Sequence, residues 1–325
     1  MKAIIKAVLK AALISALPVF SCGMAAAQEY PSKPIRMVVP FPAGGVVDYV
    51  ARQVSQKMSE SMAQTIVVEN RAGASGALAT EAVASSPADG YTLLVVFDSH
   101  VVNPHVLKDL RYDIFKDLQS VSLIAQIPLA LMTYPKFPAE TVSDLLREAK
   151  VNKLNYGTPG AGTSGHLAME QLKLLSKVDM LHVPFRGGAP LMTALLGEQI
   201  QLGVAAPGAF MSNIRDGKLK AIAVTGKQRS PALPNVPTMA EAGFPALDSG
   251  AWIGLLVPAG TPAEVVDKLN KEVVRAVRHP EVSKLLLQQT VEAVGSTPSE
   301  FDQFLRAEYN KWGQVVSDAK LSLKP

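Results

Sequence analysis

Short apolar strands that alternate with amphipathic helices constrain the fold of this chain more than any other feature. Residues 35–39, 65–69 and 91–96 are strand-like, and apolar residues recur at helical spacing between them. The pattern resumes further along, with strands expected at 122–127, 129–134, 154–157, 178–183, 201–205 and 221–224, and helices from 141, at 166–175 and at 190–196. This alternation predicts an α/β fold of parallel sheets with helices on their faces.

The C-terminal part adds one expected strand and three expected helices, at 254–257, 263–278, 280–289 and 299–317. No tandem repeat or low-complexity linker separates the two α/β sets. We therefore expect two lobes joined by several crossing segments, with a cleft between them. The expected boundaries are 28–125 plus 228–325 for lobe 1 and 126–227 for lobe 2, with crossings near Leu123–Leu129 and Thr225–Pro231.

The N-terminal residues 1–27 read as a cleavable signal peptide. Three lysines precede an apolar run at 11–20, and small residues at 25–27 precede Gln28. A membrane anchor is the alternative, but the run is about half the ~20 residues that a span needs, and Pro18 interrupts it. Cys22 leaves lipidation open. We expect cleavage near Ala27 and a periplasmic mature protein.

Composition excludes several classes of protein. The chain of 325 residues is 48% hydrophobic and 18% charged, which fits neither a coiled coil nor a disordered chain. A single cysteine excludes a disulfide scaffold. The net charge of +4 falls to 4 − 3 = +1 without the three N-terminal lysines, so nothing electrostatic favours a nucleic-acid partner.

Two glycine-rich loops, at 41–45 and 157–165, each join an expected strand to an expected helix. The first N–H groups of such a helix lack partners, so each loop is a candidate anion site. Glycine needed only for turn geometry is the alternative for either loop alone. Neither loop contains a phosphate-binding or dinucleotide-binding motif, and His166 replaces the second glycine of a hydrolase elbow.

Two isolated polar residues beside these loops have open interpretations. His166 and Glu170 share a helical face and could bind a metal, but no further histidine or cysteine lies near them in sequence, which favours structural roles. Asp48 either caps the helix that follows the first loop or binds an amino group.

Several segments resemble, in the expected order, the substrate-binding proteins of tripartite tricarboxylate transporters, the Bug family. The resemblance covers essentially the whole mature chain. It is carried by residues 40–52, 68–76, 88–94, 154–157, 160–167, 182–188, 234–243, 252–255 and 258–262.

The resemblance implies a type II-like periplasmic receptor whose two lobes close on a small organic anion, typically a carboxylate. It implies a monomer that delivers its ligand to membrane permease subunits, without catalysis, cofactor or metal. The ligand-binding residues it implies are Phe41, Ala43, Gly44 and Gly45 on one side, and Thr158, Gly162, Thr163, Ser164 and His166 on the other.

The chain departs from the family pattern after the third strand, where Phe97-Asp98-Ser99-His100 stands in place of the usual small polar residues. An acid at Asp98 near the cleft would repel a second ligand carboxylate, although a role in capping a turn is the alternative. Ala205 and Ala206 stand where relatives often carry an acid or amide. Arg186 is a candidate direct partner for the carboxylate, against a structural role beside Gly187.

We therefore expect a receptor that captures a carboxylate for transport. A receptor subunit that signals occupancy to a membrane sensor would have the same fold, so the sequence does not separate the two. An exported hydrolase that uses Ser164 is a remote alternative. Which carboxylate is bound is left open.

Overall fold

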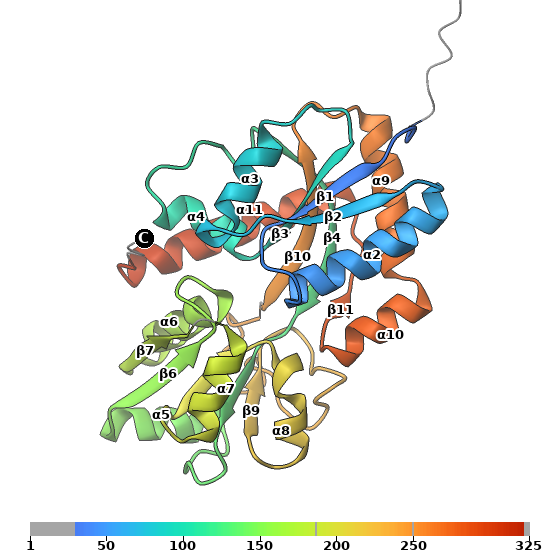
Figure 1. The fold of residues 1–325 in the computed structure, drawn as a ribbon. Helices are drawn as coiled ribbons and strands as arrows, with labels where there is room; N and C mark the ends of the chain where they lie inside the picture. Colours follow the sequence, from blue (N-terminus) through green and yellow to red (C-terminus); the bar gives the residue numbers. More distant parts are fainter. Residues whose placement is uncertain (1–29, 186, 249, 322–325) are drawn as a thin grey trace, which may run out of the picture. The chain divides into compact units, whose positions relative to one another are not determined.

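The computed structural model describes residues 30–185, 187–248 and 250–321, so the expected signal peptide and Cys22 lie outside the described residues. From Lys33 onward the chain forms one compact unit. Its strands form a six-stranded sheet ordered β11-β4-β10-β3-β1-β2 and a five-stranded sheet ordered β7-β6-β8-β5-β9 (Figure 1). The expected α/β fold with two sheets is confirmed. No helix of the described part is both long and apolar enough to cross a membrane.

The six-stranded sheet combines parallel and antiparallel pairs. As the alternation predicts, β1 lies parallel to both β2 and β3, whereas β10 runs antiparallel to β3 and β4, and β11 antiparallel to β4. Its strands are β1 (Ile35–Val39), β2 (Ile66–Asn70), β3 (Thr92–Phe97), β4 (Leu118–Ile127), β10 (Ala251–Pro258) and β11 (Glu292–Ala293).

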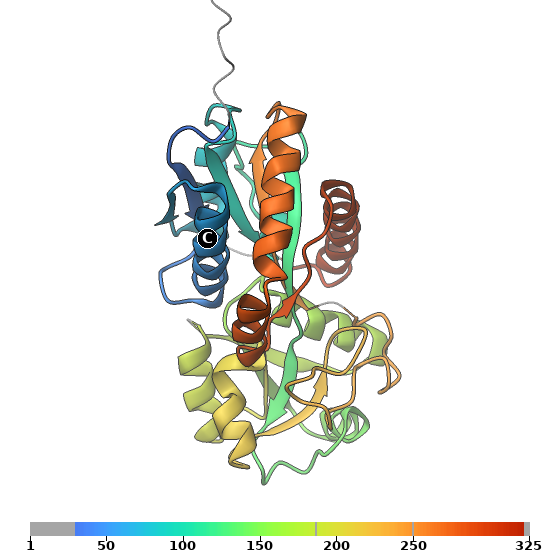
Figure 2. The ribbon, with the colours of Figure 1, turned by 90° about the vertical axis from the view of Figure 1, so that its right-hand side faces the viewer.

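Helices cover both faces of this sheet. One face carries α3 (Ala77–Ala84), α4 (Ser99–Val106) and α11 (Pro298–Asp318), whose apolar residues share one core with the strands. On the other face α2 (Val46–Met62) packs against α9 (Ala263–Val277), with α10 (Pro280–Gln288) beside them. Figure 2 shows α9 and α11 running beside β4, which both contact.

The five-stranded sheet contains β5 (Ala130–Thr133), β6 (Leu154–Thr158), β7 (Met180–Pro184), β8 (Leu202–Ala205) and β9 (Lys220–Val224). The parallel strands β7, β6 and β8 alternate along the chain with α5 (Val142–Val151), α6 (Ser164–Ser176) and α7 (Gly188–Leu196). A short turn of 3-10 helix, η2 (Pro207–Phe210), and α8 (Met211–Arg215) follow β8. Thr141 and Asp144 form a capping box at the start of α5, where the sequence pattern places the beginning of a helix.

The helix α4 is not predicted by the sequence pattern. It spans eight residues and contains Pro104, so the apolar periodicity is too short to stand out. It begins directly after Asp98, the position at which the chain departs from the family pattern.

Two segments connect the sheets and lie side by side. The first is Pro128–Leu129, between β4 and β5, which falls within the expected crossing. The Leu129 N–H donates to Thr225 Oγ1 at 2.9 Å, and the Thr225 N–H donates to the Leu129 carbonyl at 2.8 Å. The second segment leads into β10 and ends at Gly250. Gly250 packs so closely on the backbone of Ile127 and Pro128 that a Cβ would not fit.

The segment after β9 stays beside the five-stranded sheet past residue 228, where the return to lobe 1 is expected. Val224 pairs with Thr238, and the Met239 N–H donates to the Val224 carbonyl at 2.8 Å. Leu233 and Val236 pack into the core of the five-stranded sheet. The chain therefore stays beside this sheet for at least ten more residues than expected, because its apolar side chains are buried there.

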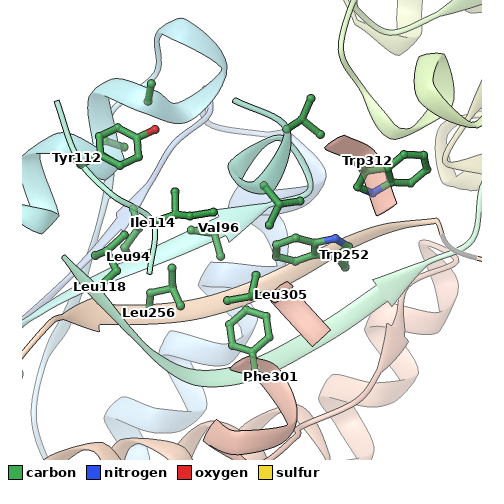
Figure 3. Packing of buried hydrophobic residues seen from close by; sticks show 14 of the residues in the cluster. Leu94, Val96, Tyr112, Ile114, Leu118, Trp252, Leu256, Phe301, Leu305 and Trp312 are labelled. Carbon is green, nitrogen blue, oxygen red and sulfur yellow. The ribbon is translucent and has the colours of Figure 1, made fainter. Parts of the chain in front are cut away.

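The core between α11 and the six-stranded sheet is built around aromatic rings (Figure 3). Trp252 of β10 lies edge-to-face with Phe301 and Phe304 of α11, at centroid distances of 5.9 and 5.5 Å. The Phe301 ring packs directly over Gly254, where a Cβ would clash with it. A glycine in the middle of this strand is therefore required for the close approach of α11.

This packing predicts that Gly254→Ala lowers the free energy of unfolding by about 1–3 kcal/mol, the usual effect of overpacking a core. Urea denaturation measures it. The double variant Gly254→Ala with Phe301→Leu is expected to lose less free energy of unfolding than the sum of the losses in the two single variants. Simple additivity would contradict the steric explanation.

Candidate functional site

A cavity of about 640 Å³ is lined by residues from segments at the edges of both sheets. Its walls come from the loops and helix starts after β1 and β6, the ends of β3 and β8, the short helix η2 and the start of α7. The crossing residue Leu129, the start of β10 and the residue after α10 complete them. The lining residues are Gly44, Gly45, Val46, Tyr49, Phe97, Leu129, Pro159, Thr163, Ser164, Gly165, Gly188, Ala189, Val204, Ala205, Ala206, Gly208, Ala209, Phe210, Ala251 and Gln289.

The first glycine-rich loop leads from β1 to the start of α2. Gly44 has φ +84°, a conformation that favours glycine. Gly45 is the N-cap of α2 and provides no side chain to cap it, and the first bond of the helix is from the Tyr49 N–H to the Gly45 carbonyl. The N–H groups of the first turn are thus left for another acceptor.

Asp48 holds this loop in shape. Its carboxylate is buried and accepts hydrogen bonds from the Gly44 N–H at 2.9 Å, from Asn70 at 2.9 Å and from Arg52 at 3.0 Å. Burial raises the pKa of Asp48, but these hydrogen bonds outweigh it and lower the pKa below its usual value. Asp48 is not among the cavity-lining residues, and the N–H that it accepts belongs to Gly44 of the loop, so it stabilises the loop and does not cap α2 as one of the two expectations had it.

The second glycine-rich loop leads from β6 to α6 and is fixed by its own hydroxyl groups. Thr158 and Thr163 each donate to the Gly160 carbonyl at 2.8 Å. Gly162 has φ +73°. Thr163 is the N-cap of α6, but its hydroxyl is used within the loop and does not cap the helix.

His166 supports the second loop from behind. Its Nδ1 accepts the Gly162 N–H at 3.0 Å, so the neutral ring carries its proton on Nε2. The ring stacks on His182 at a centroid distance of 3.8 Å, and His182 Nε2 lies 2.7 Å from Thr158 Oγ1. Burial lowers the pKa of His166, and burial with the neighbouring His166 and Lys173 lowers that of His182 to about 3. Both rings are therefore neutral near pH 7.

Glu170 is engaged in the same buried cluster and does not form a metal site with His166. It accepts a hydrogen bond from the Tyr156 hydroxyl at 2.5 Å and pairs with Lys173 at 2.9 Å. Among the described residues no group of three or more histidine, cysteine or acidic side chains could hold a metal ion.

Asp98 reaches from the end of β3 to the start of α6. It is 1% exposed, and its Oδ2 accepts the Ser164 N–H at 3.2 Å. Burial raises the pKa of Asp98 to about 6, against the hydrogen bonds from the hydroxyl and backbone of Ser164 and the backbone of Ser99, which lower it. Its Oδ1 has no hydrogen-bond partner in the described part of the chain. Ser99 turns away and donates to the Ser75 carbonyl at 2.9 Å.

Some of the ligand-binding residues predicted from the sequence line the cavity, and others lie outside its lining. Gly44, Gly45, Thr163 and Ser164 line the cavity. Phe41, which packs edge-to-face on Phe97, and Ala43, Asp48, Asp98, Ser99, Thr158, Gly162 and His166 are not among the lining residues. Arg186 lies outside the described residues.

Sequence reasoning missed the walls of the cavity. Tyr49 and Phe97 both line the cavity and adjoin predicted loops in sequence. Tyr49 lies in the first turn of a helix and Phe97 at the end of a strand, and these positions could have indicated both residues. Ala251 and Gln289 come from distant parts of the chain and carry no local signal. Gly208 packs against the Gln289 backbone so tightly that a Cβ would not fit, which brings η2 and the end of α10 together.

The loop geometry predicts that Gly44→Val abolishes ligand binding while the protein stays folded, because a β-branched residue is strained at φ +84° and its side chain enters the cavity's edge. Titration calorimetry on the folded variant measures it. Gly217→Val is the matched control, since Gly217 has φ +69°, equally open surroundings and no place in the cavity. Unchanged affinity in Gly44→Val would remove the first loop from the site.

Comparison with known proteins gives one family and close structural matches. The family model described as tripartite tricarboxylate transporter family receptor matches residues 50–321. Protein BugT of Bordetella pertussis is 32% identical over 321 residues, which cover 96% of this chain and 98% of that protein.

Three solved structures are similar over almost their whole length. A periplasmic transporter is 40% identical with a TM-score of 0.80, and the match covers 91% of this chain and 100% of that one. A protein of R. palustris with adipate is 32% identical with a TM-score of 0.80, covering 90% and 99%. MatC from Rhodopseudomonas palustris with bound malate is 33% identical with a TM-score of 0.76, covering 88% and 100%.

Proposed function

Because the chain belongs to the receptor family of the tripartite tricarboxylate transporters, we propose that it captures a small organic carboxylate in the cavity between its sheets. The family is the one expected from the sequence motifs, and its members are periplasmic solute-binding receptors. The adipate and malate in two similar structures support a carboxylate as the class of ligand.

The observation that carries this proposal is the gathering of helix starts at one cavity. Helices α2, α6 and α7 have their N-caps, Gly45, Thr163 and Gly187, at or next to its lining, and none of the three has a side-chain cap. Uncapped first turns offer free N–H groups and the positive end of the helix dipole. These donors suit an anion without any cationic side chain.

Binding without catalysis fits the contacts of the hydroxyl and imidazole groups at the site. A serine hydrolase needs its nucleophile within hydrogen-bond reach of a general base. Among the described residues no hydrogen bond joins the Ser164 hydroxyl to a histidine, because Ser164 is paired with Asp98 and the Nδ1 of His166 accepts the Gly162 N–H. These contacts support a receptor over the hydrolase alternative.

We propose export by a signal peptide cleaved near Ala27, followed by delivery of the ligand to permease subunits in the membrane. The periplasmic members of the family support the location. The basic and apolar order of residues 1–27 supports the export route.

The proposal is tested by titrating the mature protein with short-chain and aromatic carboxylates in a calorimeter, with the products analysed after long incubation. We expect saturable binding of at least one carboxylate and its recovery unchanged. Loss of the ligand to a product would show an enzyme, and absence of binding by every carboxylate would contradict the proposed ligand class.

We also propose that the lobes close around the ligand by bending at Pro128–Leu129 and at Gly250, which packs against it. A buried ligand needs an open state to enter, and few residues join the sheets at these segments. Small-angle scattering is expected to give a smaller radius of gyration with saturating ligand. Identical curves with and without a ligand that calorimetry shows to bind would contradict closure.

A further inference from the structure

The walls of the cavity are apolar, in contrast to the backbone donors at its helix starts. Among the described residues that line it, no side chain is charged, and only Tyr49, Thr163, Ser164 and Gln289 are polar. Tyr49, Phe97 and Phe210 supply aromatic surface, and Phe97 is held by Phe41 at a centroid distance of 5.6 Å. The remaining lining consists of aliphatic side chains, proline and glycine.

One of the helix starts is already occupied by an acid of the protein itself. The first N–H of α6, that of Ser164, donates to Asp98 Oδ2 at 3.2 Å. Asp98 comes from the six-stranded sheet and Ser164 from the five-stranded sheet, so the contact crosses the cavity's edge. The positive end of the α6 dipole is thereby neutralised locally, which leaves the starts of α2 and α7 for the anionic group of the ligand.

A second ligand carboxylate would meet unfavourable surroundings. Away from the helix starts it would lose its hydration to aliphatic and aromatic walls, without a cation among the described lining residues. Beside α6 it would approach Asp98, which lies directly behind the lining residue Ser164 and whose Oδ1 is buried without a hydrogen-bond partner in the described part of the chain. With a pKa of about 6, Asp98 is ionised at pH 8, so the two anions would repel each other.

We infer that this receptor selects a monocarboxylate with an apolar chain or ring, and that Asp98 is the residue that discriminates against a second carboxylate. This inference rests on the proposed function. It distinguishes the chain from the two similar proteins whose structures hold the dicarboxylates adipate and malate. In those complexes both ends of the ligand are anionic. This cavity has hydrogen-bond donors for one anionic end of a ligand and apolar walls for the rest of it.

Matched pairs of ligands test the inference in the wild-type protein. Hexanoate and adipate share a six-carbon chain and differ by one carboxylate, and benzoate and terephthalate form the corresponding aromatic pair. At pH 8 we expect calorimetry to show the monocarboxylate of the preferred pair binding at least about tenfold tighter than its dicarboxylate.

Two variants assign the discrimination to a residue. Asp98→Asn keeps an oxygen that can accept the Ser164 N–H and removes the charge, so we expect the affinity for the dicarboxylate to rise about tenfold relative to the monocarboxylate. Asp117→Asn is the matched control, because Asp117 is a partly buried acid of the same sheet's layer that accepts the Asp113 N–H at 2.8 Å and does not line the cavity. Its selectivity is expected to be that of the wild type.

The outcomes separate this inference from the function on which it rests. If the wild type binds the dicarboxylate of each pair as tightly as its partner or more tightly, the proposed function stands and the inference is overturned. If Asp98→Asn folds and keeps the wild-type selectivity, the role of Asp98 is overturned. If Asp98→Asn does not fold, the affinities of the wild-type protein for the two ligand pairs still decide the ligand class. The selectivity of Asp98→Ser then decides the role of the charge. If no carboxylate binds, both proposals fall.

Discussion

The unmet hydrogen bonds at the starts of helices α2, α6 and α7 are the constraint on which the rest of this site depends. A parallel strand that continues into a helix places the helix start at the carboxyl edge of the sheet, so such starts gather where two sheets face each other. Because Gly45 and Gly187 provide no capping side chain, the first turns of α2 and α7 stay open to a ligand, whereas the Ser164 N–H at the start of α6 is already taken by Asp98. An anion completes hydrogen bonds that the fold leaves incomplete.

The donors are useful only if the loops that carry them hold their shape without ligand. Asp48 does this for the first loop by accepting the Gly44 N–H, and His166 does it for the second by accepting the Gly162 N–H. The two supports use opposite electrostatics. Asp48 is kept ionised by Arg52 and Asn70, whereas burial keeps His166 neutral, which it must be for its Nδ1 to accept a proton donor.

The contact between Asp98 and Ser164 joins the two lobes at the same place where the ligand is expected. A buried carboxylate is costly unless donors surround it, and the start of α6 supplies one such donor. Leu167, one turn further along α6, packs into the core cluster of the six-stranded sheet and buries the contact. The same acid therefore joins the two sheets' layers and, in the proposed selectivity, is the charge that a second ligand carboxylate would meet.

The sequence by itself determined the strands, the long helices and the two loops. Apolar periodicity reports which face of an element is buried, and glycine at positions such as Gly44 and Gly162 reports a conformation that other residues avoid. Only the tertiary structure decided the short helix α4, the late return of the chain near Met239, and the walls formed by Phe210, Ala251 and Gln289. Cavity walls are built by residues far apart in sequence, and no local pattern records which of them meet. The partner of Asp98 was hidden for the same reason, since Ser164 lies 66 residues away on the other sheet's helix.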